Sequence, residues 1–162
     1  YYGTEQYLHD DTNGGDDPYN RPMMTQWDTD TELYRSIRLL SGLRRLNPAI
    51  SMGSHWQKYI TPDVYCYVRR YRDSVCFVAL NRGGATTLEN VETELPDGEH
   101  TCILTREKYE VVDGKIAHLD LAERGVIVFS HVGERVKGQT IVRVQLNGVQ
   151  TLPGETIVVT GD

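Results

Sequence analysis

A change of hydrophobic period at Asn47-Pro48 constrains the fold of this chain more than any other feature. Before it, apolar residues recur at steps of three and four, which is typical of a helix with one apolar face: Leu33, Ile37, Leu40 and Leu43. After it, apolar residues alternate with polar ones or form short continuous runs, which is typical of β-strands. The sequence therefore predicts one helix followed by an all-β region.

Start and stop signals bound the predicted helix. Thr29 and Glu32 stand in the Ser/Thr-x-x-Glu spacing of a capping box, which predicts the helix N-terminus. Asn47-Pro48 ends the helix, and two arginines fall in its last turn, where the helix dipole favours positive charge. We interpret the helix arginines as a solvated face: Arg35, Arg38, Arg44 and Arg45.

Short runs with strand character follow at close spacing. They cover residues 64–71, 75–80, 88–95, 101–104 and 126–129, with a hairpin at 111–116 around Asp113-Gly114. An Asp-Gly pair is favoured in tight hairpin turns because both central residues need positive φ. Closely spaced strands without intervening helices predict an antiparallel sandwich or Greek key. We interpret Trp56 and Tyr59 as side chains that pack on the sheet rather than as a surface sugar site.

Composition excludes some partners. The formal net charge of -6 and the isoelectric point near 5.3 argue against a nucleic acid or an anionic membrane, since both need a concentrated basic face. Neutral polyhydroxyl ligands stay open. Of the three cysteines, Cys66 and Cys76 lie in apolar runs and Cys102 has no Cys-x-x-Cys partner, which favours small buried hydrophobes over a metal or redox site.

A polar loop precedes the helix. Residues 9–17 hold Asn13-Gly14-Gly15 among aspartates, and Asp17-Pro18-Tyr19-Asn20-Arg21 follows at once. Carboxylates, amides and an arginine are the groups that a protein needs to hold a sugar by its hydroxyls. We interpret His9-Asp10-Asp11 and Asp16 as solvated loop residues rather than as a metal cluster or an acid–base pair. For Trp27, a sugar-stacking platform and a contact between the loop and the helix are both open.

Several segments together resemble the α-amylase superfamily of glycoside hydrolases, most closely cyclodextrin glucanotransferases and α-amylases that carry a starch-binding module. The matching segments are residues 1–7 (YYGTEQY), 17–24 (DPYNRPMM), 43–50 (LRRLNPAI), 63–65 (DVY), 79–82 (ALNR) and 144–162. The resemblance covers almost the whole chain, and its first two segments are the most specific.

The resemblance implies a mostly β chain cut from a larger protein. Residues 1–50 would be the last strand, loop and helix of a (β/α)8 barrel, and residues 51–132 an all-β C domain built as an antiparallel Greek-key β-sandwich. Residues 133–138 would be a linker. Residues 139–162 would be the first strands of a family 20 starch-binding module, too few to bury a core by themselves.

The resemblance also implies a function for the loop. In the family, an Asp and an Arg at the positions of Asp17 and Arg21 contact sugars at donor subsites, and loops after barrel strands build the active face of this fold. The catalytic carboxylates would precede Tyr1, so we expect no catalytic residue, no metal ligand and no activity in this chain alone. A bound Ca²⁺ is expected only in the part of the larger protein that precedes Tyr1.

The expected substrate is starch, maltodextrin or another α-1,4-glucan, acted on by a secreted monomer without a nucleic-acid or membrane partner. Hydrolysis and transglycosylation stay open as the reaction. The alternative is a non-catalytic carbohydrate-binding or structural β-sandwich protein, in which the helix is an appendage.

Overall fold

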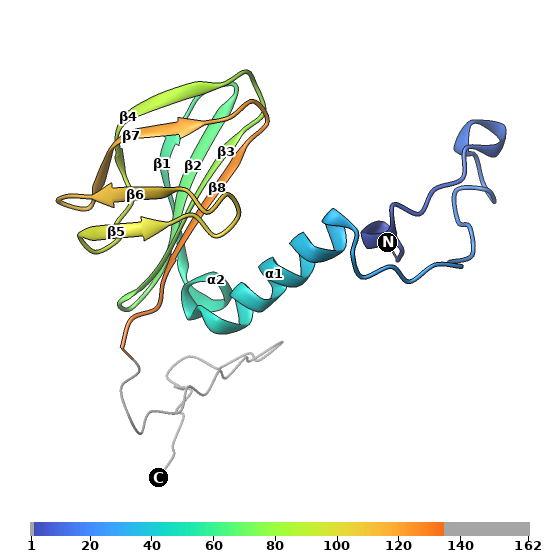
Figure 1. Cartoon of the computed structure of the whole chain (residues 1–162), viewed down its shortest axis with the longest axis horizontal. Coiled ribbons are helices and arrows are strands. Elements are labelled where there is room, and N and C mark those ends of the chain that lie inside the picture. Colours follow the sequence, from blue (N-terminus) through green and yellow to red (C-terminus); the bar gives the residue numbers. More distant parts are fainter. Residues whose placement is uncertain (1, 135–162) are drawn as a thin grey trace, which may run out of the picture.

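The computed structural model describes residues 2–134. Two 3₁₀ turns come first, η1 (Thr4–Gln6) and η2 (Thr12–Gly15), and the helices α1 (Glu32–Leu46) and α2 (Pro48–Met52) follow. The strands are β1 (Ser54–Ile60), β2 (Val64–Tyr71), β3 (Ser74–Asn81), β4 (Thr86–Glu92), β5 (Gly98–Thr101), β6 (Lys108–Val111), β7 (Lys115–Leu121) and β8 (Val126–His131). The helix α1 extends away from the strands, and the N-terminal segment lies beyond it (Figure 1). The predicted order of a helix followed by an all-β region is confirmed.

The strands form an antiparallel sandwich. One layer is a four-stranded sheet in the order β1-β2-β3-β8, and the pairs β4–β7 and β5–β6 lie on its inner face (Figure 1). Buried side chains from both layers belong to one hydrophobic cluster. The mostly β, antiparallel fold expected from the strand pattern is therefore confirmed.

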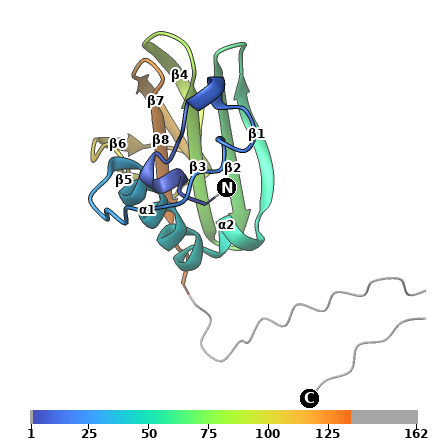
Figure 2. The same ribbon diagram turned by 90° about the vertical axis from the view of Figure 1, so that its right-hand side faces the viewer.

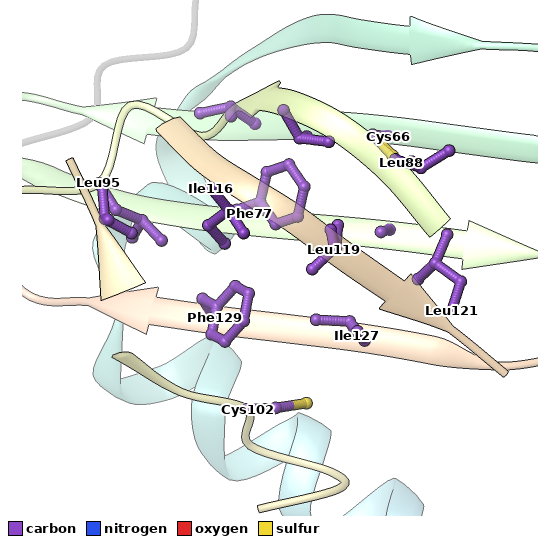
Figure 3. Packing of buried hydrophobic residues seen from close by; sticks show 14 of the residues in the cluster. Cys66, Phe77, Leu88, Leu95, Cys102, Ile116, Leu119, Leu121, Ile127 and Phe129 are labelled. Atoms are coloured by element: carbon purple, nitrogen blue, oxygen red, sulfur yellow. The ribbon is translucent and has the colours of Figure 1, made fainter. Parts of the chain in front are cut away.

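The core lies between the two layers (Figure 3). The rings of Phe77 and Phe129 are stacked, with their centroids 6.1 Å apart, and both side chains are fully buried. The strand β7 covers them with Ile116, Leu119 and Leu121. Burying one such side chain contributes about 1.5–3 kcal/mol, so this cluster is the main source of stability in the sandwich.

The outer face of the four-stranded sheet carries a second, smaller cluster. Cys76, Val78 and Val128 are buried there, and Leu43 of α1 and Ile50 of α2 pack against them. Figure 2 shows α2 at one end of the sheet, beside β2 and β3. Because these helices cover part of its second face, β3 reads as a continuous apolar run rather than as an alternating one.

The three cysteines are free and buried, which confirms the prediction of small buried hydrophobes. Burial raises the pKa of the Cys66 thiol to about 11, and it raises that of Cys76 to about 11 as well. Both thiols are therefore protonated at neutral pH and poor nucleophiles.

The helix α1 ends where the sequence predicts but is capped differently. Its N-cap is Thr31, whose hydroxyl accepts a hydrogen bond from the backbone N–H of Tyr34 at 3.1 Å. The expected capping box from Thr29 to Glu32 is wrong by two positions, because Glu32 is the first helical residue and cannot reach back from N3. In the described chain, neither helix is long and apolar enough to cross a membrane.

Asn47 joins the helices to the sandwich. Its side-chain amide is fully buried and donates to the carbonyl oxygen of Val75 at 3.0 Å, the hydroxyl of Ser130 at 2.8 Å and the carbonyl oxygen of His131 at 3.2 Å. Its Oδ1 accepts from the N–H of Ala49 at 2.8 Å and so caps α2. One side chain therefore ends α1, starts α2 and ties both to β3 and β8.

Some predicted strand boundaries change. The expected strand at 101–104 is wrong beyond Thr101, because residues 102–104 belong to a turn that Arg106 closes with a hydrogen bond to the oxygen of Cys102. Tyr2 and Gly3 form a turn rather than a strand end. The hairpin turn at Asp113-Gly114 is confirmed, with φ of 50° and 70°. The strands predicted within 139–162 lie outside the described residues.

Candidate functional site

The polar loop runs from η1 to the start of α1 and is fastened at its base. The side-chain amide of Gln6 donates to the carbonyl oxygen of Asp28 at 2.9 Å and accepts from the N–H of Asp28 at 2.7 Å. The hydroxyl of Thr31 donates to the carbonyl oxygen of Glu5 at 2.7 Å. These contacts bring the two ends of the loop together.

A turn at residues 16–20 brings the two predicted site residues together. The carbonyl oxygen of Asp16 accepts from the N–H groups of Tyr19 at 2.8 Å and Asn20 at 3.2 Å. The chain therefore reverses, and Nη2 of Arg21 donates to Oδ1 of Asp17 in an ion pair four residues apart. Asp17 and Arg21 thus form one polar unit.

This ion pair is exposed. The side chain of Asp17 is 65% exposed and that of Arg21 57%. Exposed ion pairs contribute only about 0–1 kcal/mol to stability, so fold stability gives little reason for this arrangement. Arg21 has further N–H donors and Asp17 further lone pairs that this contact does not use. Such a unit can bind neighbouring hydroxyl groups.

The histidine and aspartates nearby form no metal centre. Nδ1 of His9 is hydrogen-bonded to the carbonyl oxygen of Tyr7 at 2.8 Å, and this contact and then the charge of Asp11 raise the pKa of His9. Hydrogen bonds from Thr12 hold the pKa of Asp10 below its usual value. Within residues 2–134, no group of three or more His, Cys, Asp or Glu side chains could hold a metal ion.

Three aromatic side chains are more exposed than packing onto the helix or the sheet would make them. Trp27 is 69% exposed, so it does not pack the loop onto the helix. Trp56 is 56% exposed and Tyr59 39%, so the expected sheet packing of this pair is wrong. Both belong to the edge strand β1, whose seven residues are all exposed or half-buried, so neither face of this strand is covered within the described chain.

The sandwich carries a hollow of about 580 Å³ between β4, β7 and β8, which the sequence analysis did not predict. Its polar groups already bind one another: the hydroxyl of Thr87 donates to Asp120 at 2.6 Å, and that of Thr105 donates to Glu107 at 3.0 Å. Burial, and then the charges of Glu107 and Asp120, raise the pKa of Tyr109 to about 12. The loop is the better candidate, because the Asp17–Arg21 pair is exposed, whereas the carboxylates of the hollow accept hydrogen bonds from hydroxyls of the sandwich.

Comparisons with known proteins identify relatives of this chain. Residues 57–132 match the alpha amylase, C-terminal all-beta domain. The cyclomaltodextrin glucanotransferase of Thermoanaerobacterium thermosulfurigenes is 35% identical over 168 residues, which is 99% of this chain and 23% of that enzyme. The chain belongs to the α-amylase family. It is similar to the α-amylase of Niallia circulans as well, at 40% identity over 106 residues, or 64% of this chain and 19% of that enzyme.

A solved structure of another member of the α-amylase family is similar to this chain. It is a cyclomaltodextrin glucanotransferase described as the first with a three-domain ABC distribution. It superposes with a TM-score of 0.73 at 42% identity, covering 83% of this chain and 29% of its own. The first curated relatives align over 14% to 26% of their own length, so the chain spans about a quarter of such proteins or less.

Proposed function

We propose that this chain is part of a retaining glycoside hydrolase or transglycosylase that acts on α-1,4-glucans, and that Asp17 and Arg21 hold sugars at its donor subsites. The observation that carries the proposal is the exposed Asp17–Arg21 pair on a loop fastened at its base. Support comes from relatives named cyclomaltodextrin glucanotransferase and α-amylase, one of them aligned over 99% of this chain.

The pair suits this role chemically. In a paired guanidinium and carboxylate, the guanidinium presents N–H donors and the carboxylate presents lone pairs at set angles, which matches the neighbouring hydroxyls of a glucose unit. Binding a sugar remote from the reacting bond provides energy for positioning that bond. Retaining chemistry needs two carboxylates about 5 Å apart, and we assign these to parts of the protein outside this chain.

The exposed apolar face of α1 supports the proposal that this chain is part of a larger protein. Ile37 and Leu40, on the face predicted to be apolar, are 41% and 42% exposed within the described chain. Covering such a face is favourable, so we propose that residues 1–50 pack against the rest of a (β/α)8 barrel. We further propose a C domain at 51–132, a linker at 133–138 and the start of a starch-binding module at 139–162. An extracellular location, a monomeric state and a Ca²⁺ site outside this chain stay predictions.

The test replaces both residues of the pair in the complete protein. The variant with Asp17→Ala and Arg21→Ala should bind maltooligosaccharides roughly ten- to hundredfold more weakly, since hydrogen bonds to charged groups are lost. Its product-size distribution should shift as well. Affinity is measured by calorimetry and products by chromatography. Residues 1–162 alone should hydrolyse no starch.

A matched control removes another exposed ion pair. Glu99 and Lys108 lie 2.8 Å apart on the sandwich, and both side chains are more than half exposed. The variant with Glu99→Ala and Lys108→Ala should keep wild-type affinity and products. Unchanged affinity and products in the Asp17 and Arg21 variant would refute the proposal.

A further inference from the structure

Gln6 makes an unusual double contact with one residue far along the chain. Its Nε2 donates to the carbonyl oxygen of Asp28 at 2.9 Å, and its Oε1 accepts from the N–H of the same residue at 2.7 Å. The two residues are 22 positions apart. An amide side chain offers a donor and an acceptor side by side at neutral pH, so the side chain of Gln6 pairs with the backbone of Asp28 as another peptide group would.

The segment closed by this contact carries the Asp17–Arg21 pair. Between Leu8 and Thr31 the only regular element is η2, and none of these residues is buried. Ordering such a segment costs about 1–2 kcal/mol per residue in backbone entropy, and little apolar burial offsets that cost here. Within the described chain its conformation therefore depends on a few hydrogen bonds, and the paired contact at Gln6 is one of them.

A second contact acts on the same loop next to the site. The hydroxyl of Tyr2 donates to the carbonyl oxygen of Pro22 at 2.6 Å, one residue after Arg21. With this contact at one point and Gln6 at the base, the peptide that carries Arg21 is held toward the N-terminal segment. Loss of the base contact would release the other end of the loop.

We propose that Gln6 is a positioning residue, which fixes the loop so that Asp17 and Arg21 meet the sugar in one orientation. The inference rests on the proposed function for its substrate, but its structural part can be tested without one. Gln6 does not itself touch the sugar. Its effect on binding passes entirely through the Asp17–Arg21 pair.

The first measurement is amide hydrogen exchange in the complete protein. Gln6→Ala removes both hydrogen bonds, and Gln6→Glu keeps the acceptor but places a charged oxygen against the carbonyl of Asp28. In both variants the amide of Asp28 should exchange about tenfold faster or more, because its acceptor is lost or destabilised. Gln26→Glu is the matched control: it makes the same change on the same loop, at an exposed side chain, and should leave this amide unchanged.

The second measurement is a double-mutant cycle on maltooligosaccharide affinity. Gln6→Ala alone should weaken binding about three- to tenfold, since the site must then be ordered when the sugar binds. In a protein that already carries Asp17→Ala and Arg21→Ala, Gln6→Ala should cause no further loss. A loss of the same size in both backgrounds would show that Gln6 acts independently of the pair, and would overturn the inference.

The outcomes separate the two proposals. Unchanged exchange at Asp28 in both Gln6 variants overturns the inference and leaves the proposed function intact. Faster exchange with wild-type affinity, while the Asp17 and Arg21 variant binds weakly, also overturns it. Wild-type affinity in every variant refutes the proposed function and the positioning role with it. Equal unfolding temperatures of Gln6→Ala and wild type confirm that any lost affinity is local.

Discussion

Replacing Asn47 tests how the helical segment is attached to the sandwich. Asn47→Ala removes the N–H groups that reach Val75, Ser130 and His131, together with the oxygen that caps α2. No apolar surface of comparable size is lost, so the effect reports on polar contacts alone. The site is fully buried, and water cannot replace the missing partners without a rearrangement.

The magnitude follows from the contacts. The amide has two N–H groups, and a buried carbonyl left without its donor costs about 1–3 kcal/mol. Loss of an N-cap costs about 1 kcal/mol. Because Ser130 can turn its hydroxyl to another partner, we expect a total loss of about 3–4 kcal/mol in the free energy of unfolding. That is a large fraction of the 5–15 kcal/mol typical of a domain.

The measurement is urea unfolding of this chain, followed by tryptophan fluorescence and circular dichroism. Asn20→Ala, at an exposed position in the loop, is the matched control and should change stability by less than about 0.5 kcal/mol. If Asn47→Ala lost no more than this control, the buried amide would not hold the helices to the sheet, and the reasoning would be refuted.

Two further predictions concern the helix cap and an ion-pair cluster. Thr31→Ala should destabilise the first turn of α1 by about 1 kcal/mol, measured as faster amide exchange at Tyr34. Thr29→Ala should leave this exchange unchanged. Equal effects of the two substitutions would show that the capping box predicted from Thr29 to Glu32 is correct after all. Burial alone would raise the pKa of Glu94, but its contacts with Lys58 and Arg70 outweigh burial and hold that pKa below 4.5. The contribution of Glu94 is thus present above pH 4.5 and lost as the pH falls through its folded pKa, by at most about 1 kcal/mol. Glu94→Gln should flatten the stability profile in that window, measured by urea unfolding at several pH values, while the exposed Glu123→Gln should not; identical profiles would contradict the assignment.

The sequence correctly predicted those elements that neighbouring residues determine. Asn47-Pro48 ends α1 because proline cannot continue a helix, and Asp113-Gly114 forms a turn because both residues tolerate positive φ. The strand β2 alternates buried Val64, Cys66 and Val68 with half-buried tyrosines, so its period was visible in the sequence. In these cases neighbouring residues suffice to determine the structure.

Tertiary contacts explain the errors. The apolar run at 102–104 resembles a strand, but it forms a turn that packs against both clusters. Cys102 is buried in the core, Ile103 packs against the cluster on the outer face of the sheet, and Leu104 packs against both. The strand β1 was missed because its seven residues are exposed or half-buried, without alternation. Its backbone pairing with β2 determines it, and such pairing leaves no pattern in its side chains.

In the candidate site, too, some residues were predicted from the sequence and others were not. The resemblance to the family, and not a local pattern, singled out Asp17 and Arg21, and the structure pairs them. The contact between Gln6 and Asp28 had no signal, since nothing local links positions 22 residues apart. The residues that we propose to bind the sugar were thus easier to find in the sequence than the residue that we propose to position them.

The two halves of the described chain are stabilised by different forces, which has a consequence for function. Among residues 2–46 only Gly3 is buried, so the loop and most of α1 depend on hydrogen bonds, while the sandwich depends on its apolar core. Polar contacts of about 1 kcal/mol each can open and close without unfolding a core of many buried side chains. The loop can therefore loosen while the sandwich stays folded, so changes at Gln6 should alter binding but not global unfolding. Asn47 contacts both halves, and we expect its loss alone among these positions to destabilise the sandwich and release the helix that follows the loop.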